Sequence, residues 1–428
     1  MQKRWIALIT LTSLGVFAFI MLKGASGRYA FESHVQNWKR PPQEKDVDQA
    51  PASQTSNQAS SLTPGCVDFL NGYLKDNKNP EPKSGALDAE SVVAEVMALE
   101  KQKSDIIVQK ILSAMTQSKT KEQLKENMPE QGPTHFAYHQ FSRTQKKMEA
   151  CLGMESIEAT QNCLNANKKR YSSIQFFDTT LLANINREIA PKSVLDMGSG
   201  NGGFLRGFFE GGAEKTAGVE ISELGPIAYY TSGWEYESGP VQLPLFVPQG
   251  EPTVEALMCT MFGKEGAAFD MVWSAEVFEH IPREKHCEIM NFLAPKVGKF
   301  LVTSVAAMGQ AGVGHVANRM RVDFKEDWES RGFVYDGELT KRVVKGGKIS
   351  WYVNNIQVFR APEDRQAVKA ADCGSKENWL PYTDFDQKTV FFRNGKTLAL
   401  TDWQKHPELA RCFESQLREC KYIDGFDP

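Results

Sequence analysis

Residues 193–212, SVLDMGSGNGGFLRGFFEGG, contain the pattern that decides the fold. A short apolar run leads to Asp196, a glycine-rich turn follows, and apolar residues resume at Phe204. This order predicts a buried strand, a tight turn and a helix. In open α/β sheets, ligands bind at the carboxyl ends of the strands, where glycines let the backbone approach a ligand closely. We therefore expect a ligand site at Asp196 and the glycine turn.

The next segment predicts the kind of ligand. Residues 215–221, KTAGVEI, are typical of a second strand, and Glu220 lies at its end. Glu220 follows Gly198 by 22 residues, the offset at which an acidic side chain reaches ribose hydroxyls. A nucleoside-containing cofactor is therefore expected. Gly198, Gly200 and Gly203 also satisfy the G-x-G-x-x-G motif of NAD-dependent dehydrogenases, but that motif alone is a weak signal.

Three features disfavour a dehydrogenase. Asp196 stands just before the glycines, where dinucleotide-binding folds usually keep an apolar residue. Residues 269–281, FDMVWSAEVFEHI, predict a fourth strand that ends in a polar cluster. The pattern after it predicts one more strand, a helix and then two strands split by a glycine turn. The remaining strands are expected at residues 241–247, 299–305, 333–344 and 351–359, with Gly346 and Gly347 between the last two.

Together, VLDMGSGNGGF, GVEIS and FDMVWSAEVFEHI resemble the S-adenosylmethionine-dependent class I methyltransferases, and within them the branch with an E-V-x-E-H fourth strand. The resemblance covers residues 172–360. It implies an α/β fold: a Rossmann-like seven-stranded sheet with helices on both faces, whose last two strands form an antiparallel hairpin. The enzyme would be a membrane-anchored member of this family.

The resemblance also implies that S-adenosyl-L-methionine is the cofactor. Asp196 and the backbone of the glycine turn would hold its methionine part, and Glu220 its ribose. The expected cofactor-binding residues are Asp196, Gly198, Ser199, Gly200, Asn201, Gly202, Glu220 and Ser274. The family's acidic residue that contacts adenine after strand three has no clear counterpart, and Gln249 or Glu251 stands nearest to that place.

Transfer of a methyl group to a hydroxyl requires removal of its proton, usually by a histidine or a carboxylate. The candidate catalytic residues are His315, His280 and Glu276. His280 and Glu276 belong to the end of the fourth strand, and His315 lies in a glycine-rich stretch after the fifth. The alternatives are structural: His280 would cap the strand, and Glu276 would accept a hydrogen bond. Asp270 is expected to be structural, so no metal site is predicted, although some sugar and catechol methyltransferases use a divalent ion.

The N-terminus predicts a location. Residues 5–22 are an uncharged run of 18 residues. As a helix they would extend about 27 Å, enough to cross an ER-type bilayer. We expect a signal anchor of a type II membrane protein, with residues 1–4 as a cytoplasmic tip and residues 23–65 as a disordered stem. This layout is typical of Golgi and ER enzymes with a luminal catalytic domain. The alternative is a cleaved signal peptide and a secreted protein.

Two extensions flank the expected catalytic domain at residues 172–360. Residues 66–171 are expected to be helical, with Ser104 or Asp105 capping a second segment, and to pack on the body or mediate self-association. His135 and His139 are four residues apart, but without a third ligand nearby they indicate a surface rather than a metal site. Residues 361–428 are expected to form a cap, with a hairpin turn at Asn394-Gly395 and a helix over residues 407–420.

Cysteine placement supports a lumen-facing protein. Cys259 and Cys287 fall on expected helices of the body, where we expect buried thiols. The other six cysteines lie outside the body, and we expect disulfides to staple the extensions: Cys66, Cys151, Cys163, Cys373, Cys412 and Cys420. The alternative is that the cysteines are reduced and scattered by chance. The chain lacks an N-x-S/T sequon, which weakens the luminal interpretation slightly.

Composition excludes other classes of function. Lys and Arg number 50 against 53 Asp and Glu, a net charge of −3, so the basic excess of a nucleic-acid-binding protein is missing. We expect a methyltransferase that O-methylates a glycan hydroxyl in the endomembrane lumen. A lipid or quinone-like small molecule at the membrane is the alternative acceptor, and a non-catalytic protein that retains the fold is the alternative class. The helical extension makes a homo-oligomer possible.

Overall fold

The computed structural model describes residues 62–77, 88–127, 148–167, 177–220, 227, 241–244, 251–264, 266–312, 314–374, 382–384, 387–391, 397–399, 402 and 405. The chain divides into two units, residues 1–53 and 54–428, and every described residue belongs to the second. None of the helices in this described part is long and apolar enough to span a bilayer. The predicted anchor over residues 5–22 lies outside the described residues, as does the predicted stem up to residue 61.

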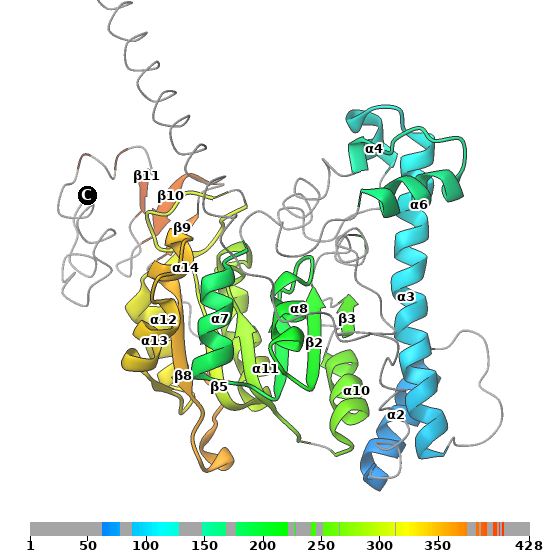
Figure 1. Ribbon diagram of the computed structural model, residues 1–428. Coiled ribbons are helices and arrows are strands. Elements are labelled where there is room, and N and C mark those ends of the chain that lie inside the picture. The colour runs from blue at the N-terminus through cyan, green and yellow to red at the C-terminus, as the bar shows by residue number, and fades with distance from the viewer. Residues whose placement is uncertain are drawn as a thin grey trace, which may run out of the picture. The chain divides into compact units, whose positions relative to one another are not determined.

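A seven-stranded sheet in the order β3-β2-β1-β4-β5-β8-β7 lies at the core of this unit (Figure 1). Its strands are β1 (Ser193–Met197), β2 (Lys215–Glu220), β3 (Val241–Pro244), β4 (Phe269–Ser274), β5 (Val297–Thr303), β7 (Val334–Tyr335) and β8 (Gln357–Arg360). The first five strands pair in parallel, whereas β8 is antiparallel to both β5 and β7. The predicted Rossmann-like seven-stranded sheet is confirmed, and its last two strands pair in the antiparallel sense but are not joined as a hairpin.

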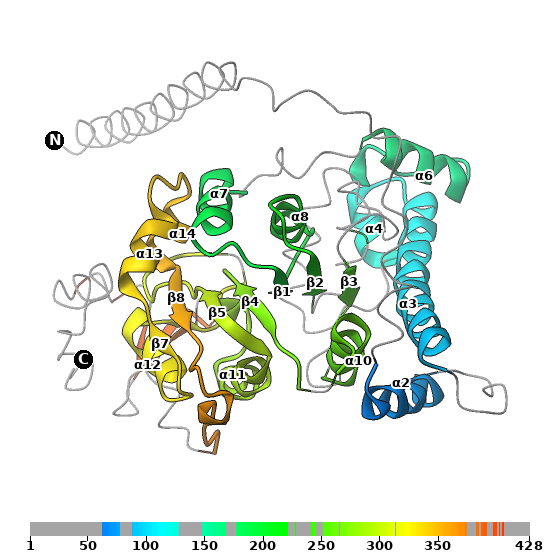
Figure 2. The same cartoon turned by 60° about the horizontal axis from the view of Figure 1, so that its bottom comes forward.

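Helices cover both faces of the sheet (Figure 2). One face carries α7 (Thr179–Glu188), α8 (Gly203–Glu210), α13 (Gly337–Val344) and α14 (Ser350–Asn355). The other carries α10 (Glu251–Phe262), α11 (His286–Leu293) and α12 (Arg321–Glu329). Successive residues of β1 alternate between the faces: Val194 packs with the first group of helices and Leu195 with the second. Burial on both faces explains why the strands are almost continuously apolar.

The prediction of a long strand over residues 333–344 was wrong. β7 is only two residues long, and α13 occupies most of the expected strand. The strand expected over residues 351–359 was also partly wrong, because α14 takes its first half and only β8 remains as a strand. The carboxylate of Asp336 caps α13 by accepting a hydrogen bond from the N–H of Leu339 at 2.8 Å. Leu339 and Val343 are both buried and lie four residues apart, a helical spacing that the apolar content of the segment concealed.

The N-terminal extension is helical, as predicted, with α2 (Pro64–Asn77), α3 (Ala89–Gln117), α4 (Lys121–Asn127) and α6 (Ile157–Ala166). The predicted break in the long helix was wrong, because α3 runs without interruption past Ser104 and Asp105. Ser104 is buried inside the helix, and Asp88 is the N-cap. His135 and His139 lie outside the described residues.

The C-terminal extension adds a second sheet in the order β11-β10-β9-β6. Its strands are β6 (Asn318–Arg319), β9 (Tyr382–Asp384), β10 (Thr389–Phe391) and β11 (Thr397–Ala399). β10 and β11 pair in the antiparallel sense of the predicted hairpin, although its turn at Asn394-Gly395 and the helix expected over residues 407–420 lie outside the described residues. Short 3₁₀ turns complete the fold at η5 (Phe278–His280), η6 (Arg283–Lys285), η7 (Ala294–Lys296) and η8 (Arg365–Ala367).

Disulfides join both extensions to the body of the protein. Within the described chain, the pairs are Cys66–Cys259, Cys151–Cys163 and Cys287–Cys373. The expectation that Cys259 and Cys287 are buried free thiols was therefore wrong, because each is the partner of a cysteine in an extension. The sequence did not reveal these pairs because the partners are 193 and 86 residues apart. Cys412 and Cys420 lie outside the described residues.

Candidate active site

The glycine turn joins β1 to α8 at the carboxyl end of the parallel strands. Gly198, Gly200 and Gly202 have φ angles of 77°, 57° and 73°, a left-handed backbone that favours glycine. The N–H groups of Gly198 and Ser199 donate to the carbonyl oxygen of Val219 at 2.8 and 3.1 Å. The turn is therefore fixed to the end of β2.

Two buried carboxyl groups lie at this turn. Asp196, near the end of β1, is 2% exposed, and Glu220, the last residue of β2, is fully buried. Oε2 of Glu220 accepts a hydrogen bond from the N–H of Gly200 at 2.6 Å. Burial raises the pKa of Asp196 well above its usual value, the negative charge of Glu220 adds to the rise, and the N–H of Leu205 opposes it. Such a pair favours a ligand that brings positive charge or hydroxyl donors.

Three further predicted cofactor residues differ in what they offer. Ser199 packs its side chain against β2, because a Cβ at Gly218 would lie 2.8 Å from its Oγ. Oδ1 of Asn201 accepts a hydrogen bond from the N–H of Gly203 at 3.2 Å and helps to close the turn. Ser274, the last residue of β4, is fully buried, and its hydroxyl finds no partner within the described chain. A buried polar atom of this kind is a point that a bound ligand can satisfy.

The segment after β4 packs directly on the glycine turn. A Cβ at Gly198 would lie 2.4 Å from Cγ2 of Val277, so only glycine leaves room for this approach. Val277 is the residue between Glu276 and Phe278, where η5 begins. The contact therefore puts the predicted catalytic segment beside the predicted cofactor site.

Glu276 is held by a network of donors. Its backbone is left-handed, with φ of 56°, a conformation that costs a non-glycine residue about 1–3 kcal/mol. Oγ of Ser304 accepts a hydrogen bond from its N–H at 2.8 Å and donates to its Oε1 at 2.9 Å. Gln310 and Asn355 also donate to its carboxylate, at 3.2 and 3.3 Å. Burial raises the pKa of Glu276, and these donors oppose the rise. These contacts match the structural alternative for Glu276, in which its carboxylate accepts hydrogen bonds.

Glu279 is the site residue that the sequence prediction missed. It is fully buried in η5. Burial raises its pKa well above the usual range, and the charge of the neighbouring Glu276 adds to the rise. Two carboxyl groups that interact this closely do not both ionise readily, so the pair favours a shared proton or a bound cation. The E-V-x-E-H pattern contains both glutamates and was the available signal.

The two predicted histidines lie together. The ring centroids of His280 and His315 are 5.0 Å apart, and the rings are nearly perpendicular. Nδ1 of His280 lies 3.0 Å from the carbonyl oxygen of Gly314. Because a carbonyl oxygen only accepts, Nδ1 carries the hydrogen. His315 is 6% exposed and depends on Gly312 for space, since a Cβ there would lie 1.9 Å from Nε2 of His315.

Backbone contacts fix the loop that carries His315. The N–H groups of Val316 and Ala317 donate to the carbonyl oxygen of Glu279 at 2.8 and 3.1 Å. Nδ2 of Asn318 donates to the carbonyl oxygens of Ala307 and Gln310 at 2.7 and 2.6 Å. The loop is therefore tied both to η5 and to the chain after β5, which keeps His315 beside His280.

Glu279, His280 and His315 form a group that suits a metal ion. One ligand atom from each lies within 4.8 Å of the others, and all three residues are buried. Nitrogen and carboxylate ligands of this kind bind divalent transition metals. This convergence runs against the prediction of no metal site. Asp270 is outside the group. Its carboxylate accepts a hydrogen bond from the N–H of Lys192 and forms a salt bridge with Lys299, both at 2.9 Å.

The adenine contact is not described. Gln249 lies outside the described residues, and the side chain of Glu251 is not described either. The structure thus brings Asp196, Glu220 and the glycine turn together, and next to them His280 and His315 with Glu276. Glu279 joins this second set.

No protein-family model matches the chain, and no curated protein matches it. Several solved structures are similar in fold. The magnesium protoporphyrin IX methyltransferase of Synechocystis PCC 6803 with bound SAH is 16% identical over 53% of this chain and 97% of its own, with a TM-score of 0.34. The N-methyltransferase NodS of Bradyrhizobium japonicum WM9 is 14% identical over 43% and 85%, with a TM-score of 0.27. An O-methyltransferase family protein of Burkholderia thailandensis is 10% identical over 84% and 98%, with a TM-score of 0.36. Likenesses this distant do not identify a reaction.

Proposed function

We propose that this chain is an S-adenosylmethionine-dependent methyltransferase. The observation that carries the proposal is the packing of Val277 on Gly198, which joins a ligand site with two buried carboxyl groups to a buried group of one glutamate and two histidines. S-adenosylmethionine has an ammonium group, a sulfonium and two ribose hydroxyls. These are the charges and donors that a site with two buried carboxyl groups favours.

In this proposal Asp196 and Glu220 divide the cofactor between them. Asp196 takes the cationic methionine part, and Glu220 accepts hydrogen bonds from the ribose hydroxyls. Burial raises the pKa of Asp196 in the ligand-free protein, and a cation beside it lowers that pKa again. Cofactor binding is therefore coupled to loss of a proton from Asp196 wherever the empty site still holds that proton.

When bound, the cofactor supplies an electrophilic methyl group on a sulfonium, which is a good leaving group. The protein's own task is to orient the acceptor hydroxyl and to take its proton. His280 suits this task, because the carbonyl oxygen of Gly314 holds the hydrogen on Nδ1 and the neutral ring then presents Nε2 as its basic nitrogen. His315 packs against this ring and Glu279 lies within the same group, so the imidazolium that forms has a carboxyl group nearby.

A bound divalent cation is the second candidate for this task. The specific observation in its favour is that Glu279, His280 and His315 each offer a ligand atom within 4.8 Å of the others. A cation there would lower the pKa of a coordinated hydroxyl, which would replace a general base. Dialysis against a chelator, followed by metal analysis and a transfer assay, separates the two candidates. Full methyl transfer by the metal-free protein would support His280 as the general base. Transfer that is restored only by an added cation would support the metal-bound mechanism.

The acceptor is a glycan hydroxyl in the lumen of the Golgi or ER. The disulfides Cys66–Cys259, Cys151–Cys163 and Cys287–Cys373 support a lumen-facing protein, because disulfides persist in oxidising compartments. The apolar run at residues 5–22 supports attachment to the membrane. A lipid or quinone-like small molecule remains the alternative acceptor, and a non-catalytic protein that retains the fold is the alternative class. Self-association through the helical extension is part of the same proposal, and nucleic acid is not an expected partner.

Isothermal titration with S-adenosylmethionine tests the first part. We expect binding by the full chain that weakens at least tenfold in Asp196→Ala. Gly72→Ala is the matched control, because a Cβ at Gly72 meets nothing within 4 Å. Absence of binding, or equal affinity in Asp196→Ala, would contradict the proposal.

Incubation with the methyl-labelled cofactor tests the acceptor. The full chain is mixed separately with glycan, lipid and protein fractions of a cell extract. We expect label in the glycan fraction, and none with His280→Ala. Label confined to the lipid fraction would reject the glycan, and cofactor binding without label in any fraction would favour a non-catalytic protein.

A further inference from the structure

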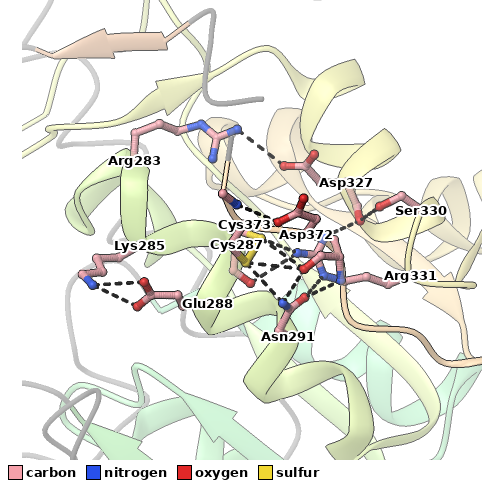
Figure 3. The surroundings of a disulfide bond; sticks show 12 residues. Arg283, Lys285, Cys287, Glu288, Asn291, Asp327, Ser330, Arg331, Asp372 and Cys373 are labelled. Carbon is pink, nitrogen blue, oxygen red and sulfur yellow. Dashed lines mark hydrogen bonds and ion pairs between the residues drawn. A yellow bond between two sulfur atoms is a disulfide. The ribbon is translucent and has the colours of Figure 1, made fainter. Parts of the chain in front are cut away.

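One disulfide lies between the catalytic body and the C-terminal sheet. Cys287 belongs to α11, and Cys373 belongs to the chain that follows β8 (Figure 3). The next described strand after Cys373 is β9, which pairs with β6. β6 begins at Asn318, three residues after His315. The disulfide therefore fixes the chain shortly before it joins the sheet that includes the candidate catalytic loop.

This disulfide differs from the other two in access. Cys66 and Cys151 are 0% exposed and Cys259 is 4% exposed, so each of the other bonds has at least one fully buried sulfur-bearing residue. Both Cys287 and Cys373 are partly exposed. Cys163 is also partly exposed, so a reductant in solution reaches either sulfur of Cys287–Cys373, only the Cys163 side of Cys151–Cys163, and neither side of Cys66–Cys259 easily.

The two sulfurs of this bond have different surroundings (Figure 3). Nη2 of Arg331 lies 3.3 Å from Sγ of Cys287. The guanidinium is held by Oδ1 of Asn291 at 2.9 Å and by the carbonyl oxygen of Asp327 at 2.6 Å. Burial lowers the pKa of Arg331 to about 10, so it stays cationic near neutral pH. A thiolate that leaves at Cys287 would form beside a positive charge, and a stabilised thiolate leaves faster.

Among the described residues, the segment that leads to Cys373 is also tied to the body through Asn291 and through Arg331, whose carbonyl oxygen accepts a hydrogen bond from the N–H of Lys369 at 3.2 Å. Nδ2 of Asn291 donates to the carbonyl oxygen of Ala371 at 2.8 Å and to Sγ of Cys373 at 3.2 Å. The N–H of Ala371 donates back to Oδ1 of Asn291 at 2.9 Å. Two of these three contacts of Asn291 need only the backbone at Ala371 and survive reduction. The disulfide covalently holds the chain to α11 at Cys373, the last such link before the described chain resumes in β9.

We propose that Cys287–Cys373 is a reducible site through which thiols control the C-terminal sheet. A thiolate of a dithiol reductant attacks Sγ of Cys373, the S–S bond breaks, and Cys287 leaves as a thiolate beside Arg331. The second thiol of the reductant then attacks the mixed disulfide, which releases Cys373 and the oxidised reductant. Two electrons and two protons pass from the dithiol to the protein. The reduced form holds β9 less firmly on β6 and so loosens the loop that carries His315.

The first test uses the full chain and needs no methyl acceptor. Dithiothreitol is added in steps, free thiols are trapped with N-ethylmaleimide, and labelled cysteines are identified by peptide mass spectrometry. We expect Cys287 and Cys373 to be labelled at least tenfold faster than Cys66 and Cys259. Equal rates, or faster labelling of Cys66, would overturn the proposal.

A matched pair of variants tests the role of Arg331. Arg331→Lys keeps the positive charge and Arg331→Gln removes it, while both lose the geometry of the guanidinium. We expect Cys287–Cys373 to be reduced several-fold more slowly in the glutamine variant than in the lysine variant. Equal rates in the two variants would show that the charge does not assist the leaving sulfur.

Hydrogen exchange tests the consequence for the fold. On reduction we expect faster exchange at the amides of β9 and β6, with unchanged protection in β1 and β4. Unchanged exchange at β6 would refute the link to His315. The activity consequence rests on the proposed function: reduced protein should keep its cofactor affinity and lose transfer rate. Because labelling and exchange do not require transfer, failure of this proposal is distinguishable from failure of the proposed function.

Discussion

Replacing Gly312 with alanine tests the placement of His315 most directly. The new Cβ would lie 1.9 Å from Nε2 of His315 and 2.3 Å from its Cδ2 and Cε1. Because carbon contacts are comfortable only beyond about 3.5 Å, the ring would have to withdraw by about 1.6 Å. His315 is 6% exposed, so it has little open space into which to move. A misplacement of about 1 Å in a catalytic group can cost about 100-fold in rate, or about 2.7 kcal/mol.

The substitution should leave the fold intact. Gly312 is exposed and does not have a positive φ, so alanine introduces no backbone strain. Alanine also reduces the conformational freedom of the unfolded chain, which raises the free energy of unfolding by up to about 1 kcal/mol. The clash with the His315 ring opposes this gain, since overpacking costs about 1–3 kcal/mol, so denaturant unfolding should stay cooperative with a free energy of unfolding no more than about 3 kcal/mol lower. Titration with S-adenosylmethionine should match the parent protein, while single-turnover methyl transfer falls about 100-fold. The NMR signals of the His315 ring should shift, and Gly72→Ala should change neither the signals nor the transfer rate.

Two results would refute this reasoning. Transfer within twofold of the parent rate, together with an inactive His315→Ala, would mean that the ring of His315 is not held where the structure has it. A shifted ring signal with an unchanged rate would instead remove His315 from the transfer step.

Three further predictions concern the buried carboxyl groups and the long disulfide. The folded-state pKa of Asp196 is raised above its usual 3.8, so the folded protein holds an extra proton and loses stability as pH rises above about 4. In a thermal melt, Asp196→Asn should therefore unfold at a higher temperature than the parent, by a margin that grows with pH in this range. The same variant should bind the cofactor at least tenfold more weakly. The pKa of Glu279 is raised too, so Glu279→Gln should also stabilise the ligand-free protein. The variant should lower methyl transfer at least tenfold in the labelled-cofactor assay. It should also reduce the amount of any bound divalent metal measured by mass spectrometry. The double variant Cys66→Ser/Cys259→Ser removes a disulfide that closes a loop of 193 residues in the unfolded chain. Its free energy of unfolding in denaturant titration should be lower by about 5 kcal/mol, because the unfolded chain gains conformational entropy.

The arrangement of the predicted cofactor-binding residues followed closely from the sequence. A strand, three glycines and a helix are local features, and an acidic residue at a fixed offset needs only one neighbouring strand. Asp196, Gly198 and Glu220 therefore lie together as expected, because their positions depend on the register of β1 and β2 alone. The seven-stranded sheet was expected from the resemblance to the family, and its strand order came only from the structure.

The arrangement of the candidate catalytic residues and of the extensions was less predictable. Glu279 becomes notable only once it is buried beside Glu276, and burial is a property of the packed structure. The convergence of His280 and His315 depends on a loop that folds back on η5 through backbone hydrogen bonds. Such bonds can form with almost any residue type, so the sequence does not reveal them. Disulfide pairing was unpredictable because it depends on which segments of the chain come to lie side by side.

The Cys66–Cys259 bond also sets the order of events while the chain is being made. Cys66 emerges 193 residues before its partner. At about 5–20 residues per second, synthesis of that interval takes about 10–40 s. Cys151 and Cys163, only 12 residues apart, are both available during this wait. Cys66 must therefore either remain unpaired until α10 is complete or exchange out of a wrong partner, so correct formation of this bond is a late step in the maturation of this protein.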